Sequence, residues 1–253
     1  MKLTADNYFS KEMQMMYTGS SQIKSFLRCE SAALAELKGE YREEKTTALL
    51  VGSYVDRYFE GTLDKFIDEY PEIIVTRGEN KGELKSEYKQ ANTIITRIER
   101  DPMFMKYMNG EKQKIMTGKI EGVPVKIKID SYHPGKAIVD LKIMQNMDGK
   151  WKDNTKLNFI EYWQYDIQGA IYQAVEGNHL PFMLAVATKE KEPNIEIIKV
   201  NQDRLDFCLE IVKANIVRFS SIKKGKVEPG RCGSCDWCRS TKILTNIIDS
   251  AAL

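Results

Sequence analysis

The sequence lacks the segments that mark membrane, secreted and repetitive proteins. No run approaches the ~18 to 20 consecutive apolar residues of a membrane-spanning helix. Residues 1–16 contain no apolar segment like that of a secretory signal. Internal repeats and low-complexity segments are also missing. We therefore expect a cytoplasmic protein that has no membrane partner.

A large charge of one sign is missing as well. The chain carries 38 Lys and Arg residues against 36 Asp and Glu residues, a net charge of +2 with His neutral. This balance argues against a polybasic protein that coats nucleic acid, but it allows a local basic groove, because the placement of charges matters more than their sum. We expect one domain over residues 1–253, with an N-terminal arm over 1–18 and a cysteine-containing tail over 223–253.

Periodic patterns of apolar residues predict helices and strands in a mixed order. Apolar residues at helical spacing predict helices over residues 21–38, 46–70, 86–100, 102–108, 159–176 and 203–220. Alternating apolar residues predict three consecutive antiparallel strands within 112–143 and two further strands over 182–188 and 195–200. This order predicts a mixed α/β fold in which helices pack against one sheet.

Two acids lie on neighbouring strands of the predicted three-stranded segment. Asp130 ends one strand, and Asp140 lies between Val139 and Leu141 in the next, where a buried acid is costly unless it is used. Asp140 and Lys142 share a face of their strand. Carboxylates and the Leu141 carbonyl are ligands that Mg²⁺ prefers, and a lysine beside the ion could activate water. A partly buried ion pair between Lys142 and one acid is the alternative.

Two further groups of polar residues recur at helical spacing. Gln164, Gln168 and Tyr172 are four residues apart, so they share one face of the helix predicted over 159–176. This face could hold the Lys142 region or bind phosphate, or it could be the solvated side of the helix. Asp56 lies one turn before an acid at position 60, and it could join a metal site or simply be solvated.

In their order and spacing, these motifs resemble the PD-(D/E)XK nuclease superfamily. The closest likeness is to its RecB-like branch, with the RecE-type phage exonucleases and the CRISPR-adaptation nucleases. The matching residues are Asp130, then Asp140-Leu141-Lys142, then Gln168-Gly169-Ala170-Ile171-Tyr172. That branch has an upstream G-x-x-x-H motif with another metal ligand, and residues 52–56 take its place with Asp56 where the family has His. The resemblance covers roughly residues 20–238.

The resemblance implies a fold, a metal site and a role for each matching residue. The implied fold is restriction-endonuclease-like, with a central mixed sheet flanked by helices. The implied ligands of Mg²⁺ or Mn²⁺ are Asp56, Asp130, Asp140 and the Leu141 carbonyl. The implied catalytic residues are Asp130, Asp140, Lys142, which would position and activate water, and Gln168 and Tyr172, which would orient the catalytic strand or touch the DNA backbone.

The resemblance also implies a reaction and partners. The reaction would be hydrolysis of DNA phosphodiester bonds, and we expect an exonuclease that acts on linear double-stranded ends in phage or bacterial recombination or repair. A single-strand annealing protein and a homo-oligomer are implied partners, by analogy with ring-forming relatives. One alternative is a catalytically inactive nuclease fold that serves as a DNA-binding accessory protein. Another is a metal-cluster scaffold with unrelated chemistry.

Cysteines gather near the C-terminus. Cys232, Cys235 and Cys238 have the C-x2-C-x2-C spacing of metal ligands, which also occurs in bacterial ferredoxins. In the RecB-like branch, some members hold a [4Fe–4S] cluster with one early and three late cysteines, and Cys29 is placed as the early one. Here Glu30 follows Cys29 where Pro is common, and the last spacing is shorter than usual. Zn²⁺ is the competing metal, for which Cys208 or His179 could substitute as a ligand, and a metal-free group is the third possibility.

One basic segment combines charge with an aromatic ring. Lys150, Trp151 and Lys152 lie in the polar stretch that follows the strand with Asp140. Lysines can bind phosphates, and an indole ring can stack on a base. We therefore expect these three residues to contact DNA, and solubility is the alternative explanation for the lysines.

Overall fold

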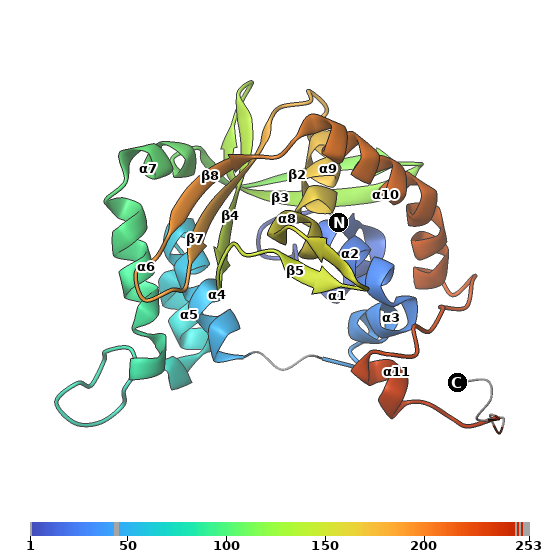
Figure 1. The fold of residues 1–253 in the computed structure, drawn as a ribbon, viewed down its shortest axis with the longest axis horizontal. Coiled ribbons are helices and arrows are strands. Elements are labelled where there is room, and N and C mark those ends of the chain that lie inside the picture. The colour runs from blue at the N-terminus through green and yellow to red at the C-terminus, as the bar shows by residue number, and fades with distance from the viewer. Residues whose placement is uncertain (1, 43–45, 246, 248, 250–253) are drawn as a thin grey trace.

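A six-stranded mixed β-sheet forms the centre of the computed structural model, and helices cover both of its faces (Figure 1). The structure describes residues 2–42, 46–245, 247 and 249. The strand order is β1–β3–β4–β7–β8, and β2 pairs with the free edge of β3. The strands are β1 (Thr18–Gly19), β2 (Glu111–Ile120), β3 (Val123–His133), β4 (Ala137–Met144), β7 (Phe182–Thr188) and β8 (Ile195–Lys199). The predicted mixed α/β class is confirmed.

The sheet combines antiparallel and parallel pairs. As predicted, β2, β3 and β4 are consecutive antiparallel strands. β4 then pairs in parallel with β7 over its whole length, and β8 returns antiparallel to β7. β3 and β4 pair over only three residues, from His133 to Ser131 on β3, and β1 pairs in parallel with β3 further along the same edge. The stretch of β3 between these two partners is therefore left open.

Eleven α-helices surround the sheet in the described part of the chain. They are α1 (Lys11–Met16), α2 (Ser20–Arg28), α3 (Glu30–Lys38), α4 (Thr47–Glu60), α5 (Leu63–Glu69), α6 (Gln90–Glu99), α7 (Pro102–Met108), α8 (Phe159–Tyr162), α9 (Tyr165–Glu176), α10 (Gln202–Lys223) and α11 (Asp236–Ser240). Among the described residues, no helix is long and apolar enough to cross a bilayer.

Buried apolar side chains form two cores, one on each face of the sheet. Helices α4 to α7 cover one face, and α2, α9 and α10 cover the other (Figure 1). Along β4 the side chains alternate between the cores, with Ile138 in the core under α9 and Val139 and Leu141 in the core under α4. Close packing of α9 depends on Gly169, because a Cβ there would lie 2.4 Å from the Phe182 ring.

Three of the predicted helices are interrupted. The first is broken at Cys29, which is extended and separates α2 from α3. The second ends at Gly61, whose left-handed conformation (φ +75°) closes α4 before α5 begins. The third is broken at Gln164, which has φ +55° and separates α8 from α9. Cys29 and Gln164 are not typical helix breakers, so local sequence does not reveal these two breaks.

The N-terminal segment packs against the rest of the fold instead of hanging loosely. Met13 and Tyr8 are buried, and β1 joins the sheet. The ammonium of Lys223, at the end of α10, donates hydrogen bonds to the carbonyls of Gln14 and Tyr17 at 2.7 and 2.9 Å. Of the predicted arm over 1–18 and tail over 223–253, residues 1, 246, 248 and 250–253 lie outside the described residues. The single-domain organisation stays a prediction.

A small hairpin replaces the irregular loop expected after β4. It consists of β5 (Lys150–Lys152) and β6 (Thr155–Leu157), which pair antiparallel in a separate two-stranded sheet. The two turn residues, Asp153 and Asn154, both have positive φ, and Asp and Asn tolerate this conformation in tight hairpin turns. The hairpin packs against α8 (Figure 1).

Candidate active site

The first two acidic residues of the site lie where β3 and β4 separate. Ser131 and Val139 form the last pair of the ladder, so Asp130 and Asp140 are the next residues on each strand. Like charges directly opposite one another destabilise a sheet, and the strands part at this point. Asp130 Oδ2 accepts a hydrogen bond from the Leu141 N–H at 2.9 Å. Because the N–H and C=O of a strand residue point to the same edge, the Leu141 carbonyl points into the same gap.

Asp140 is held from both sides. It is 2% exposed, and its Oδ2 forms an ion pair with the Lys142 ammonium. Its Oδ1 accepts a hydrogen bond from Gln168 Nε2 on α9 at 2.6 Å. Burial lowers the pKa of Lys142, but the neighbouring negative charges, above all that of Asp140, outweigh it and raise the pKa above its ordinary value. The side chains of Asp140 and Lys142 are thus fixed as a buried ion pair at the edge of the gap.

Tyr172 fixes the neighbouring strand. Its hydroxyl donates a hydrogen bond to the Lys128 carbonyl of β3 at 2.9 Å. Tyr172 and Gln168 are both buried, so they contact the sheet rather than solvent, which favours the predicted orienting role over contact with DNA. Gln164 does not share their face, because the helix breaks there. The predicted line of three polar residues is therefore wrong at its first member.

Asp56 reaches the site from α4. Gly52 lies against β4, since a Cβ there would be 3.7 Å from the Ile143 carbonyl oxygen, and Asp56 follows one turn later. Asp56 Oδ1 is buried and has no hydrogen-bond partner among the described residues. Burial, and next the charge of Asp130, raise the pKa of Asp56 well above its ordinary value. Asp56 is not a solvated acid, which was the alternative.

A cavity of about 40 Å³ lies beside these acids. It is lined by Asp56, Phe59, Glu60, Met108, Gln113, Asp130 and Leu141. Burial and the neighbouring charge of Asp140 raise the pKa of Asp130 to about 7, although the Lys142 ammonium opposes this shift. Hard oxygen donors that repel one another suit Mg²⁺ or Mn²⁺. The lining includes Asp56, Asp130 and Leu141 but not Asp140, and among the described residues the three aspartates do not form one compact group of possible metal ligands.

Sequence reasoning missed Gln113, which faces Asp130 from β2. The residues beside it pair as Lys112 with Ser131 and Lys114 with Ile129, which puts Gln113 opposite Asp130. Its Nε2 donates to Asp130 Oδ1 at 3.3 Å, and its Oε1 is buried without a hydrogen-bond partner in the described part of the chain. Gln113 has φ +51°, and such departures from regular strand geometry re-aim side chains. Counting back from the turn at residues 121–122 would have found this position.

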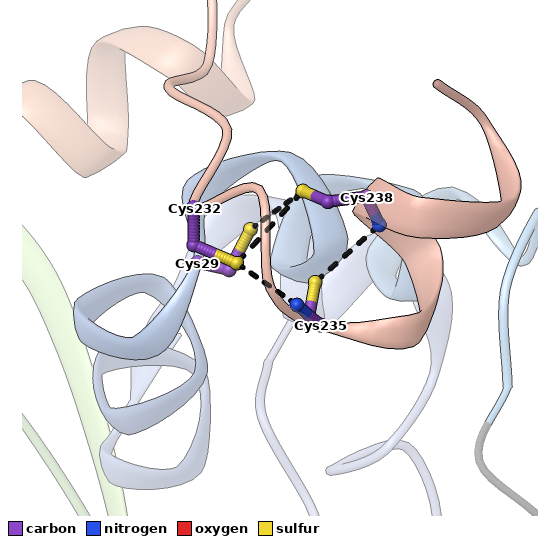
Figure 2. Close-up of side chains that lie close together, drawn as sticks. All are labelled: Cys29, Cys232, Cys235 and Cys238. Carbon is purple, nitrogen blue, oxygen red and sulfur yellow. Dashed lines mark hydrogen bonds between the residues drawn. The ribbon is translucent and has the colours of Figure 1, made fainter. Parts of the chain in front are cut away.

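Four cysteines from opposite ends of the sequence converge in a second site (Figure 2). The sulfur atoms of Cys29, Cys232, Cys235 and Cys238 all lie within 4.8 Å of one another. The sulfur of Cys238 is 3.5 Å from that of Cys29 and 3.9 Å from that of Cys232. Within the described chain, neither His179 nor Cys208 belongs to this group. These two are therefore not the substitute ligands considered from the sequence.

Backbone N–H groups donate hydrogen bonds to the sulfur atoms of two of the C-terminal cysteines. Cys232 Sγ accepts hydrogen bonds from the Cys235 N–H, and Cys235 Sγ accepts one from the Cys238 N–H, each at 3.4 Å. Hydrogen bonds from the backbone of Cys235 and of Ser234 lower the pKa of Cys232 to about 5. Burial instead raises the pKa of Cys235 to about 12. A thiolate is the form that binds a metal, so the four sulfur atoms are compatible with a metal site in which Cys232 is the most readily ionised ligand.

Glu30 ties the C-terminal cysteine segment to the body of the protein. Its carboxylate forms a two-point ion pair with Arg218 of α10, at 2.7 and 2.8 Å, and accepts the Gly230 N–H at 2.6 Å. The hydrogen bonds from the Arg218 guanidinium lower the pKa of the Glu30 carboxyl group. Glu30, which stands where Pro is common in the family, thus holds the segment that precedes Cys232 against α10. Figure 1 shows the result, in which α11 lies beside α3.

The predicted DNA-contact residues lie on the β5–β6 hairpin. Trp151 is 71% exposed. The ammonium of Lys150 lies 5.7 Å from the ring centre of Tyr162 and 5.6 Å from that of Trp163. The structure thus presents a ring and two basic side chains on one exposed ribbon, and their contact with DNA stays a prediction.

The sheet, with its paired acids and lysine at the gap between β3 and β4, has the architecture of the PD-(D/E)XK class. Residues 19–241 match the family described as "PDDEXK-like domain of unknown function (DUF3799)", and the chain belongs to this family. A crystal structure described as that of a "putative exonuclease" from Eubacterium rectale is 49% identical in sequence. The match covers 98% of this chain and 97% of the chain in that crystal structure, with a TM-score of 0.90. No curated protein is significantly similar to the chain.

These comparisons confirm the resemblance found in the sequence. The PD-(D/E)XK superfamily and the central mixed sheet flanked by helices are both as predicted. The family and the similar structure support a nuclease function, for which DNA is the substrate that the fold implies.

Proposed function

We propose that this protein is a metal-dependent deoxyribonuclease that hydrolyses phosphodiester bonds at the ends of linear double-stranded DNA, in phage or bacterial recombination or repair. The observation that carries the proposal is the group at the gap between β3 and β4. There, Asp130 and Asp140 repel each other across the gap, and Lys142 forms an ion pair with Asp140. The exonuclease activity is favoured by the description of the similar structure from Eubacterium rectale.

Each residue has a role in this reaction. Asp130, Asp140 and the Leu141 carbonyl would hold Mg²⁺ or Mn²⁺, with Asp56 as the fourth donor. The bound ion would stabilise the negative charge that develops on the phosphate and make the attacking water more acidic. Lys142 would orient that water and donate hydrogen bonds to the phosphate oxygens.

Residues on α9 would support these roles from behind. Gln168 would keep Asp140 aimed at the gap through its hydrogen bond to Oδ1, and Tyr172 would fix β3 through the Lys128 carbonyl. Partners of this kind hold ligands in the geometry that binding requires.

The test compares DNA substrates with and without ends. Purified protein is incubated with end-labelled linear duplex and with closed circular duplex, in Mg²⁺, in Mn²⁺ and in EDTA. We expect metal-dependent release of label from the linear DNA, no cutting of the circle, and no activity in an Asp140→Asn variant. Cutting of the circle at a similar rate would make the protein an endonuclease, and absence of cleavage in both metals would refute the proposal.

The cysteine group is proposed to hold a metal that joins the two ends of the fold. A [4Fe–4S] cluster is the candidate from the family resemblance, and Zn²⁺ is its competitor. Four thiolates about 2.3 Å from one zinc ion stand about 3.8 Å apart, which is close to the sulfur separations of 3.5 and 3.9 Å. A cubane spaces its thiolates more widely, because each binds a different iron, so this spacing favours Zn²⁺. Anaerobically purified protein with a broad visible absorption band would instead establish the iron–sulfur cluster.

A catalytically inactive DNA-binding accessory protein is the second candidate. The observation that favours it is Asp56, which stands where the family has His. This candidate predicts DNA binding without cleavage in Mg²⁺ or Mn²⁺. A single-strand annealing protein and a homo-oligomer stay predicted partners, and light scattering of the purified protein tests the oligomer.

A further inference from the structure

Two hollows join into one groove beside the proposed active site. One, of about 470 Å³, is lined by Trp151, Tyr162 and Trp163 among others, and we call it the aromatic end. The other, of about 480 Å³, reaches the cysteine group and is the cysteine end. The two hollows share the residues Ser25, Arg28, Lys152 and Gln164. The groove therefore runs between α2 and the β5–β6 hairpin and ends at the cysteines.

The aromatic end is lined by three basic side chains. Lys24, Arg28 and Lys152 line it, and no carboxylate does. None of these three side chains forms an ion pair with a described residue. Such a surface attracts a polyanion, because an unpaired cation in a groove is not neutralised by the protein itself.

Two large rings are exposed at this end. Trp151 is 71% exposed and Trp163 is 45% exposed. The Trp163 ring lies edge-on to that of Tyr162, with centres 5.0 Å apart. Aromatic residues held in the open beside basic side chains form a stacking platform of the kind that binds unpaired bases.

The Tyr165 ring lies close both to a lysine of the groove and to the proposed catalytic lysine. The Lys24 ammonium lies 5.5 Å from the ring centre of Tyr165, and the Lys142 ammonium lies 4.9 Å from the same ring centre. Lys24 lines the aromatic end, whereas Lys142 is paired with Asp140. A phosphate bound at Lys24 would therefore be one side chain away from the acids.

We propose that this groove binds single-stranded DNA, with bases stacked on Trp151 and Trp163 and with phosphates on Lys24, Arg28 and Lys152. The strand would run along the aromatic end and past Tyr165 toward Lys142, and not into the cysteine end, which Glu36 and Asp236 also line. Single-stranded rather than double-stranded DNA is the occupant, because the faces of paired bases are covered by their neighbours in a duplex and cannot stack on protein rings. The endpoint of this path rests on the proposed nuclease function, whereas the binding itself does not.

The test measures binding in the absence of cleavage. Fluorescence anisotropy of a labelled twelve-nucleotide oligo(dT) is compared with that of a labelled blunt hairpin duplex, both in EDTA. We expect tighter binding of the single strand, and a loss of about tenfold for each of Trp151→Ala and Trp163→Ala, as for other base–aromatic stacks. Phe207→Ala is the matched control, since Phe207 is 57% exposed on α10, outside the groove, and it should bind like the wild type.

Charge variants test the phosphate contacts. Arg28→Ala and Lys152→Ala should each weaken binding and lower the slope of log K against log[salt] by about 0.7, the value for one phosphate contact on a single strand. Two results would refute the proposal that this groove binds single-stranded DNA. One is unchanged single-strand binding in the double variant Trp151→Ala/Trp163→Ala, and the other is equally tight binding of the duplex. If the wild-type protein cleaves no DNA but these variants lose single-strand binding, the binding groove is supported and only the nuclease function is refuted.

Discussion

The carboxylate site and the cysteine site gather their ligands in opposite ways. The carboxylates come from α4, β3 and β4, which border one gap in the sheet, and they are packed inside the fold. The cysteines come from the link between α2 and α3 and from the segment that ends in α11, near the surface, where Cys232 is exposed. One site is built by the sheet, and the other joins two ends of the chain.

Their electrostatics differ as well. Burial and mutual repulsion raise the pKa of Asp130 to about 7, whereas backbone N–H groups lower the pKa of Cys232 to about 5. Protonation of Asp56 and Asp130 is therefore favoured, while the thiolate of Cys232 is stabilised by backbone hydrogen bonds. The comparison suggests a reactive metal site on one side and a structural one on the other.

The largest expected effect is loss of cleavage at the carboxylate site. Lys142→Ala should lower the cleavage rate by at least about 10³-fold, because it removes the charge that faces the phosphate. Lys142→Arg keeps the charge and the ion pair but not the shape, so it should fold normally and still lose most activity. Rates on end-labelled linear duplex are measured beside Lys156→Ala, an exposed lysine on β6. Wild-type activity in either Lys142 variant would contradict the assignment.

The next effect concerns stability at the cysteine site. Cys238→Ala should lose the bound metal and lower Tm by about 10 °C, since a structural metal contributes several kcal/mol to folding. Cys208→Ala is the matched control, because Cys208 is also buried but lies outside the cysteine group. Metal content and melting are measured together. Equal melting and equal metal content in the two variants would remove the structural role.

The proposed support of Asp140 predicts a smaller loss. Gln168→Ala should lower kcat about 10- to 100-fold with little change in KM, because the side chain holds a ligand and touches no substrate. Gln173→Ala is the control on the same helix, where Gln173 is buried and bonds the Leu180 carbonyl. If both variants lose the same activity, the effect is one of general stability and not of Asp140.

The smallest effect is a gain in stability. Asp56→Asn should raise Tm of the metal-free protein by about 2–4 °C, because burial disfavours the ionised form of Asp56 whereas an Asn side chain never ionises. Addition of Mn²⁺ should raise the Tm of this variant less than it raises the Tm of the wild type. Melting is followed in EDTA and in Mn²⁺, and a lower Tm in EDTA would show that the Asp56 carboxylate stabilises the fold.

Much of this arrangement could be predicted because its information is local. The alternation along β3 and the turn at Gly122 define the three-stranded segment, and the spacing of Cys232, Cys235 and Cys238 defines three of the four cysteines of the second site. Patterns of two or three residues reflect contacts along the chain, which the sequence records directly.

Other parts depend on contacts between distant segments. Ile129 and Tyr132 of β3 lie in the same core although they are three residues apart, so the strand alternation is interrupted at Asp130. The break at Gln164 starts α9 at Tyr165, whose ring lies near the ammonium groups of both Lys24 and Lys142. No local pattern predicts either feature, because tertiary packing imposes both conformations.

The sequence by itself determined which groups this protein has for chemistry: two acids and a lysine on adjacent strands, and four cysteines at its two ends. Only the tertiary structure decided how they meet. The separation of β3 and β4 places Asp130 beside Leu141, and the anchoring of Glu30 by Arg218 brings Cys29 to the other cysteines. The physical reason is that residue type fixes chemical capacity, whereas distance and desolvation, which set pKa and reactivity, exist only once the chain is packed.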